Sequence, residues 1–189
     1  MSTKIDELTR VIADRVRRER AALALSLEDL AERSGVSKAM ISKIERAETS
    51  ATAVVLGKLA GAFGLTLSAL LVDEAEPAGR VCRVAEQMRW TDPETGYVRT
   101  QVSPGFGGLI EVVEVSLPKG ARVPFPGSSF RRVHQLIWVL SGTLRLSEGE
   151  ITHRLDQGDS LALDKPVDRV FANDGETACR YAIIMSRRG

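Results

Sequence analysis

The sequence predicts a two-domain α+β protein, with an all-α part at the N-terminus followed by an all-β part. All seven prolines, eight of the nine aromatic residues and twelve of the sixteen glycines lie after residue 76. Residues 1–72 are rich in Ala, Leu, Arg and Glu, which favour helices. The remainder is rich in Val, Gly and Pro, which is typical of short strands between turns. We therefore expect domains at 1–72 and 81–189, joined by an acidic linker with Pro and Gly at 73–80.

Five helices are expected in the first domain. The first covers about Ile5 to Leu23, because apolar residues recur there at helical spacing. The second and third make up Ser26–Arg46. Thr52 can cap a fourth helix that ends at Gly64, and Thr66 can cap a short fifth helix through Leu71.

Two short helices joined by one glycine make Ser26–Arg46 the most informative stretch of the chain. Ser26 can cap the first of them, with Asp29 reaching back to the cap, and the helix is expected to end near Ser34. Gly35 follows, where the chain must adopt a positive φ that costs glycine little. Ser37 can then cap the next helix, so the second helix can lie across the first.

The helix after Ser37 has one apolar side and one polar side. Ile41 and Ile44, three residues apart, should point inward. The opposite side is cationic and carries small or hydrogen-bonding tips, from Lys38, Ala39, Ser42, Lys43 and Arg46. Such a side suits a DNA groove lined with phosphates and base-edge acceptors. The alternative is a plain helical bundle whose lysines are only solvated.

The stretch resembles the helix-turn-helix of XRE-type, lambda-repressor-like regulators. The matching residues are Leu25, Leu30, Ala31, Gly35, Val36, Ser37, Ile41, Ser42, Ile44 and Glu45. The resemblance covers about residues 1–72 and implies a five-helix DNA-binding domain with its helix-turn-helix at about 26–46. Leu27 departs from it, because many members carry a DNA-contacting Gln there. Leucine is common at this position among members with a cupin domain.

The same resemblance implies roles for individual residues. Lys38, Ala39 and Lys43 match positions that read bases. Contacts to the DNA backbone are expected from Ser37, Ser42, Thr49 and Ser50. Arg20 and Glu45 match a charged pair that joins the first helix to the reading helix; the alternative is two independent surface charges.

The second domain reads as strand, turn, strand. Turn signals lie at residues 92–93, 104–105, 118–120, 141–142, 148–149 and 157–159, and apolar or alternating runs at 109–117, 136–140, 143–147, 160–163 and 180–185. Short, evenly spaced strands predict an all-β barrel or jelly roll. Residues 108–186 resemble a cupin, on Trp138 to Gly142, Gly158-Asp159 and Asn173.

The usual metal ligands of cupins are missing from the matching positions. Gln135 stands in place of the Glu, Ser128–Arg131 contains no His, and Arg169 stands in place of the second-motif His. His134 is one residue away, so on a strand it should face the side opposite to Gln135. Because amide and guanidinium groups are poor metal ligands, we expect no metal, no cofactor and no enzyme activity.

An anionic or carboxylate-bearing small molecule is the effector class that the barrel residues suggest. Arg131 (or Arg132), Gln135 and Arg169 could converge on it, because a guanidinium is a good fork for a carboxylate. Alternatively, the arginines face solvent or pair with acids at 159, 164 or 168, and the barrel is mainly a dimerisation module.

These observations predict a sequence-specific DNA-binding transcriptional regulator that acts as a homodimer. The alternatives are a cupin isomerase or oxygenase with an accessory helical domain, and a pure interaction module. Residues 1–72 hold 11 Lys and Arg against 9 Asp and Glu, a net +2 that supports nucleic acid only weakly. No apolar run is long enough for a membrane span, so a cytoplasmic protein is expected, with Cys82 and Cys179 as reduced, buried thiols; a redox pair is the alternative.

Overall fold

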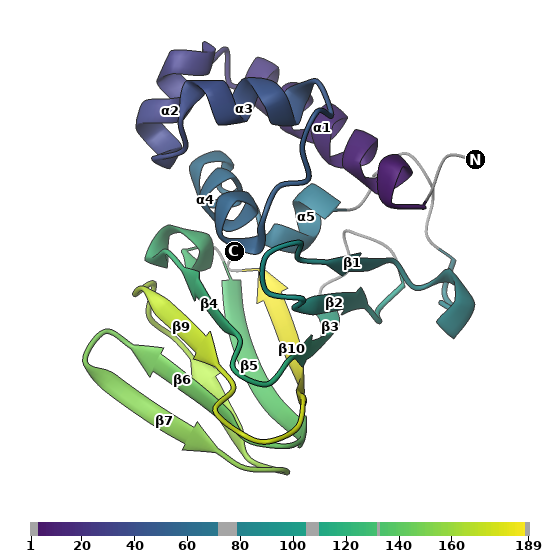
Figure 1. The fold of residues 1–189 in the computed structure, drawn as a ribbon, viewed down its shortest axis with the longest axis vertical. Helices are drawn as coiled ribbons and strands as arrows, with labels where there is room; N and C mark the ends of the chain where they lie inside the picture. The colour runs from purple at the N-terminus through teal and green to yellow at the C-terminus, as the bar shows by residue number, and fades with distance from the viewer. Residues whose placement is uncertain (1–3, 72–78, 105–109, 132, 188–189) are drawn as a thin grey trace.

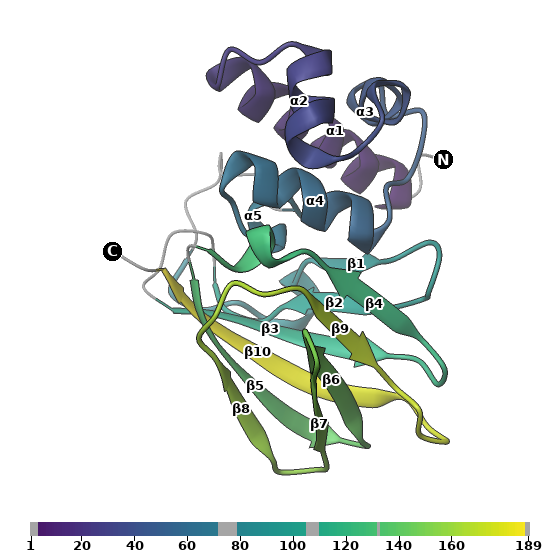
Figure 2. The ribbon, with the colours of Figure 1, turned by 90° about the vertical axis from the view of Figure 1, so that its left-hand side faces the viewer.

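The computed structural model describes residues 4–71, 79–104, 110–131 and 133–187. Five helices come first, as predicted: α1 (Lys4–Ala22), α2 (Leu27–Ser34), α3 (Lys38–Glu45), α4 (Ala53–Phe63) and α5 (Leu67–Leu71). They form a layer over one end of the strand-rich part, with α4 and α5 next to the strands (Figures 1 and 2). No helix in the described ranges is long and apolar enough to cross a membrane.

The caps predicted around the two central helices are present. The Asp29 N–H donates to Ser26 Oγ at 3.1 Å, and the Ser26 N–H donates to Asp29 Oδ2 at 2.8 Å, which completes a capping box. Gly35 ends α2 with a φ of 66°. Ser37 caps α3 by accepting from the Met40 N–H at 3.3 Å. These local bonds fix where α2 stops and where α3 begins.

Two antiparallel sheets form the second part. The first has the order β1 (Arg89–Thr91), β2 (Val98–Gln101), β3 (Ile110–Leu117), β10 (Cys179–Arg187), β5 (Val133–Ser141) and β8 (Ser160–Leu163). The second has the order β4 (Arg122–Phe125), β9 (Arg169–Ala172), β6 (Leu144–Glu148) and β7 (Ile151–Leu155). This double-sheet arrangement confirms the predicted jelly roll, although hydrogen bonds do not close it into a barrel over the described residues.

The predicted runs correspond to β3, β5, β6, β8 and β10. The other five strands were not singled out, because they are only three to five residues long and polar residues alternate in most of them. Parts of two further predictions, Leu109 and Gly105, lie outside the described residues, as does most of the 73–80 linker.

The sheets face each other across a filled interior. Val113, Ile137 and Ile183 come from the six-stranded sheet and Leu146 and Phe171 from the four-stranded sheet, and all are buried. The rings of Phe171 and Tyr181 stack across the interior with centroids 5.8 Å apart. Side chains therefore occupy most of the space between the sheets.

Helix α4 lies directly on the strand-rich part through two glycines. A Cβ on Gly57 would meet Phe125 Cδ1 at 2.7 Å, and one on Gly61 would meet Ser128 Oγ at 2.5 Å. Ser129, in the short 3-10 helix η2 (Gly127–Phe130), donates from Oγ to the Gly57 carbonyl at 2.9 Å. Only a residue without a side chain permits this approach, so Gly57 and Gly61 set the distance between α4 and η2.

Two further hydrogen bonds join helices to strands. The N–H of Ala53, the first residue of α4, donates to Asp92 Oδ1 at 2.9 Å. Asp92 is 2% exposed and also accepts from the Thr95 N–H at 3.0 Å. Arg99 Nη2 on β2 donates to Ser68 Oγ on α5 at 2.6 Å. A carboxylate at a helix N-terminus is also favoured by the helix dipole, so α4 is held at its start as well as along its face.

Candidate nucleic-acid interface and a pocket between helices and sheets

Helix α3 presents the side that the sequence predicted to face outward. Lys38, Ala39 and Lys43 are exposed, while Ile41 and Ile44 are buried on the other side. With Ser37, which is exposed, and Ser42, which is half-buried, these residues make up what we call the reading face: Ser37, Lys38, Ala39, Ser42 and Lys43. Helices α2 and α3 lie at the end of the molecule opposite β6 and β7 (Figure 1). Among the described residues, Arg46 donates a hydrogen bond to Ser42 Oγ, while Ser37, Lys38, Ala39 and Lys43 stay exposed.

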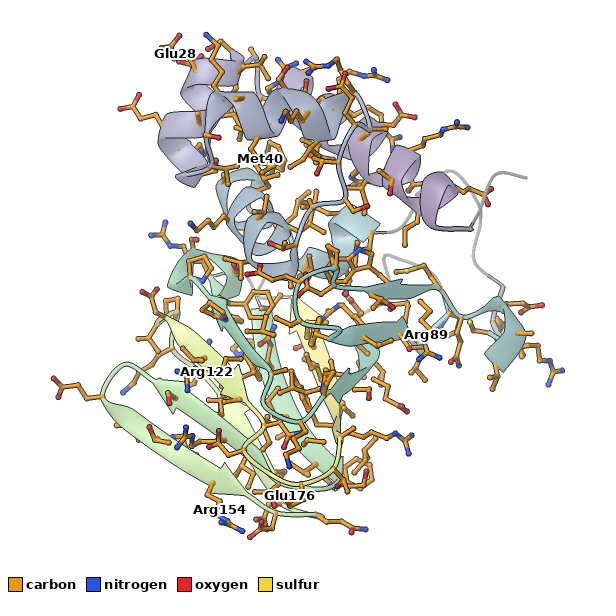
Figure 3. The ribbon with its side chains drawn as sticks, in the orientation of Figure 1. Glu28, Met40, Arg89, Arg122, Arg154 and Glu176 are labelled. Atoms are coloured by element: carbon orange, nitrogen blue, oxygen red, sulfur yellow. The ribbon has the colours of Figure 1, made fainter. Side chains whose placement is uncertain are left out.

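Acidic neighbours partly neutralise the cations around this face. Lys38 Nζ lies 3.2 Å from Glu28 Oε2, and both side chains are exposed (Figure 3 shows Glu28 at the tip of the helical layer). Arg46 Nε lies 2.7 Å from Glu48 Oε1. The hydrogen bond between the two side chains raises the pKa of Arg46 and lowers the pKa of Glu48. Exposed ion pairs of this kind contribute only about 0–1 kcal/mol, so a phosphate can replace the carboxylate at small cost.

Thr49 and Ser50 lie in the connection between α3 and α4. Ser50 is exposed and Thr49 is half-buried. Both line an apolar pocket of about 270 Å³ between α1, this connection and β1, together with Leu8, Ile12, Trp90 and others. Ser50 is therefore open to solvent at the edge of this pocket, whereas Thr49 is partly enclosed by it.

Arg20 and Glu45 form a two-pronged ion pair. Arg20 Nε and Nη2 donate to Glu45 Oε1 and Oε2 at 2.7 and 2.9 Å, and Arg20 Nη1 donates to the Leu25 carbonyl at 2.9 Å. The hydrogen bonds that Arg20 donates to Glu45 raise the pKa of Arg20. Since Glu45 is buried at the end of α3, the pair ties α3 to the last turn of α1.

The structure places the three residues expected to hold an effector in different surroundings. Arg131 is exposed after η2. Arg169 is 1% exposed, but its Nε donates to Glu148 Oε1 at 2.7 Å and its Cζ lies 4.4 Å from the Phe130 ring centroid. Arg169 is thus already neutralised by Glu148, an acid on the neighbouring strand β6 that the sequence did not point to. Arg132 lies outside the described residues.

Gln135 lines a different pocket, which lies between the sheets and the α4–α5 region. The pocket has a volume of about 40 Å³, and we call it the Arg99 pocket. It is lined by Gly57, Thr66, Leu67, Tyr97, Arg99, Phe125, Ser129, Phe130, Gln135, Phe171, Tyr181, Ile183 and Met185. Arg99 was missed because β2 is short. The alternation of Tyr97, Arg99 and Gln101, all buried, was the signal that this face of the strand points inward.

The polar groups of the Arg99 pocket are poorly satisfied. Arg99 Nη1 lies 3.3 Å from Tyr97 Oη, and Arg99 Nε is buried without a hydrogen-bond partner. Gln135 Nε2 has Met185 Sδ, a weak acceptor, at 3.2 Å. Burial raises the pKa of Tyr181 well above its ordinary value, so its hydroxyl stays protonated.

The remaining metal and redox candidates are separated. His134 is exposed and lies one residue from the half-buried Gln135 on β5, while His153 Nε2 lies 3.5 Å from Glu148 Oε2. Within the described part of the chain, no three His, Cys, Asp or Glu side chains form a group that could hold a metal ion. Cys82 is half-buried and Cys179 is buried, neither forms a disulfide, and burial raises the pKa of Cys179 to about 11.

Comparisons with known proteins agree with this architecture. The helix-turn-helix family model HTH_3 matches residues 16–70. The fold is similar to the crystal structure of an HTH_3 family transcriptional regulator from Vibrio cholerae, at 22% identity over 97% of this chain and 99% of that one, with a TM-score of 0.77. No curated protein matches the chain.

Two further solved structures match the chain with lower scores. Hydroxypropylphosphonic acid epoxidase from S. wedmorenis is 17% identical, with a TM-score of 0.48 over 97% of this chain and all of that one. The cupin_2 domain of an XRE family transcriptional regulator from Enterobacter cloacae is 14% identical, with a TM-score of 0.45 over 49% of this chain and 98% of that one.

Proposed function

We propose, from the premise that residues 16–70 are a helix-turn-helix domain of the HTH_3 (XRE-type) family, that the chain is a sequence-specific DNA-binding transcriptional regulator. The observation that carries this proposal is the reading face of α3, which is exposed, cationic and held in place by buried Ile41 and Ile44. A helix of this kind enters the major groove with its N-terminal residues toward the bases. We assign residues 1–72 to DNA binding and residues 81–189 to sensing and dimerisation, with 73–80 as the linker.

Each residue of the interface has a proposed task. Lys38 or Lys43 donates to guanine O6 and N7, and Ala39 contacts a thymine methyl. Ser37, Ser42, Thr49 and Ser50 donate to phosphate oxygens, which positions the helix without reading sequence. Arg20 and Glu45 contact no DNA in this scheme. They keep α3 at a fixed angle to α1, a role that their two-pronged geometry supports.

A second copy of the chain is the proposed partner in solution. The outer face of the six-stranded sheet carries an apolar patch in which Trp138 is 46% and Leu136 37% exposed. In register beside them lie Ala182 and Ile184 on β10, and Val112 on β3 next to Ile184. We call these five residues the outer sheet face.

The charges at one end of the outer sheet face suit a second copy of the chain. Glu114 on β3 and Arg180 on β10 form an exposed ion pair at 2.9 Å beside the patch. In an isologous interface whose two-fold axis passes close to this ion pair, each acid would lie near the partner's base. Two reading faces about 34 Å apart could then bind successive major grooves of an inverted repeat.

DNA binding tests the proposal directly. Duplex sites selected from random sequence by the full-length chain are titrated with wild type and with the Lys38→Ala, Lys43→Ala double variant. We expect the double variant to bind roughly 10- to 100-fold more weakly, with a salt slope lower by about 2.

A matched control removes two positive charges far from α3. The Arg122→Ala, Arg154→Ala variant loses exposed arginines of the four-stranded sheet (Figure 3) and should bind DNA within about twofold of wild type. Equal affinities for the reading-face variant and wild type would refute the assignment of α3.

Dimerisation is tested separately by light scattering after size-exclusion chromatography. Trp138→Glu places a charge at the centre of the outer sheet face and should yield monomers. Ile151→Glu changes an apolar residue on β7 that is even more exposed, and it should leave the dimer intact. A dimer of unchanged stability in Trp138→Glu would rule out this face.

A further inference from the structure

We propose that the Arg99 pocket is a binding site for a small carboxylate with a short apolar body, and that Arg99 is the group that recognises its charge. The inference rests on the proposed function, because it names the effector class and the place where the effector meets the DNA-binding helices. The site differs from the Arg131–Gln135–Arg169 set expected from the sequence, with which it shares only Gln135.

The charge of Arg99 is buried and uncompensated. Its side chain is 5% exposed, and its hydrogen-bond partners are two neutral hydroxyls, Tyr97 Oη and Ser68 Oγ. No carboxylate of the described residues forms an ion pair with it, in contrast to Arg169, which has Glu148. Burying a cation without a counter-charge is costly, so a protein that keeps one there gains from a bound anion.

The pocket's size and walls define the rest of the ligand. A site of about 40 Å³ exceeds the 10–15 Å³ that one water needs, and it suits a molecule of a few heavy atoms. Three phenylalanines, Ile183 and Met185 line it, so most of the ligand's surface must be apolar. Because Arg99 is the cation that lines the pocket, a ligand with one negative charge is favoured. A guanidinium with a free Nε–H offers the planar fork that fits a carboxylate.

Further donors point into the same space. Gln135 has only a thioether as acceptor, so its amide N–H can turn to a carboxylate oxygen at little cost. Tyr97 and Tyr181 also line the pocket, and both are almost fully buried. The donor set therefore consists of one cation and neutral groups, which is a good match for a monoanion.

The position of the pocket couples it to the DNA-binding helices. Gly57 of α4 and Leu67 of α5 form its helical wall, and Arg99 holds Ser68 of α5. A carboxylate that forms an ion pair with the Arg99 guanidinium competes with the Ser68 hydroxyl for the hydrogen bond from Arg99 Nη2. Binding would thus favour a different placement of α5 and α4 over the sheets, provided that the ligand prefers one placement to the other.

Isothermal titration calorimetry on the full-length chain tests the site. The probes are sodium acetate, butyrate, isobutyrate and benzoate, with butyramide, benzamide and sodium chloride as controls for shape and ionic strength. We expect at least one carboxylate to bind with a Kd below about 1 mM, and its amide and chloride not to bind. Absence of binding by all four carboxylates up to about 10 mM would overturn the proposal.

Variants decide whether Arg99 is responsible. Arg99→Met keeps the length of the side chain and removes the charge, and Gln135→Leu removes one neutral donor. Arg99→Met should abolish the binding of the best carboxylate, Gln135→Leu should weaken it about tenfold, and Arg89→Met, an exposed arginine on the neighbouring strand β1, should not change it. Binding that survives in a folded Arg99→Met would contradict the assignment. Should Arg99→Met not fold, the Gln135→Leu result decides in its place.

The same variants separate this inference from the proposed function. DNA affinity without ligand is measured for each variant beside its carboxylate binding, because Arg99→Met also removes the hydrogen bond from Arg99 to Ser68 of α5. DNA binding without any Arg99-dependent carboxylate binding would reject the site and leave the regulator. Arg99-dependent carboxylate binding in a chain with no affinity for DNA would support the site and reject the proposed regulator function.

Discussion

The outer half of the helical layer, α2 and α3, and its inner half, α4 and α5, are held in place by different kinds of contact. Helices α2 and α3 are fixed by bonds between near neighbours in sequence, such as the Ser26–Asp29 capping box and the cap from Ser37. Helix α4 is fixed by residues 39 to 72 positions away, Asp92 at its start and Ser129 on its face. The outer half thus leaves side chains of α3 exposed to solvent, while the inner half holds the helices against the sheets.

The Arg20–Glu45 pair gives the largest expected effect, because it belongs to the outer half yet spans 25 residues. Glu45→Ala leaves Arg20 partly buried without its carboxylate and should lower the free energy of unfolding by about 3 kcal/mol. Urea denaturation measures it. The exposed Arg17–Asp14 pair is the control, and Asp14→Ala should cost under about 0.5 kcal/mol. Costs of similar size would mean that Arg20 and Glu45 act as surface charges.

Gly57→Leu tests whether α4 makes the helices and sheets one cooperative unit. The new side chain would collide with Phe125, so we expect a loss of about 2 kcal/mol from overpacking. Both tryptophans, Trp90 and Trp138, lie in strands, so their fluorescence reports on the sheets while circular dichroism at the helix band reports on the helices.

In wild type the two probes should give one coincident transition. In Gly57→Leu the helix signal should melt first. Lys58→Leu, at the next position of the same helix, should keep the transitions together. Two separate transitions in wild type would show that the contacts of α4 do not couple the unfolding of the helices to the unfolding of the sheets.

Asp92 is the third test of the inner half. Asp92→Ala removes the acceptor for the Ala53 and Thr95 N–H groups in a buried site and should cost about 1–2 kcal/mol. Asp92→Asn keeps an amide oxygen there and should restore about half of that loss. Thermal melts of the three proteins measure the series. An Asn variant no better than the Ala variant would indicate that the charge, rather than the hydrogen bonds, holds α4.

Glu28→Gln is the smallest expected change and concerns the outer half alone. It frees Lys38 from its exposed ion pair, so stability should change by less than about 0.5 kcal/mol. Affinity for DNA should rise about two- to fivefold, because a negative charge beside the phosphates is removed. Fluorescence anisotropy at two salt concentrations checks it. Glu176→Gln, in the other exposed Lys–Glu pair, far from α3, should have no effect on DNA affinity.

Local patterns of residues are enough to predict the five helices, their caps and the outward side of α3. Each of these depends on residues within about four positions, as with Gly35 after α2 or Thr52 before α4. Two glycines four residues apart, Gly57 and Gly61, also carried the signal for a close helix contact, but the sequence did not say what would lie against them.

Which polar groups meet inside the strand-rich part depends on how the two sheets are assembled. There Arg169 pairs with Glu148, Arg99 has no ion-pair partner among the described residues, and Arg131 is exposed while Gln135 lines the Arg99 pocket. Strand alternation tells which residues share a face, but sheet order and register decide which strand lies opposite. Those depend on contacts between distant segments that no local pattern encodes.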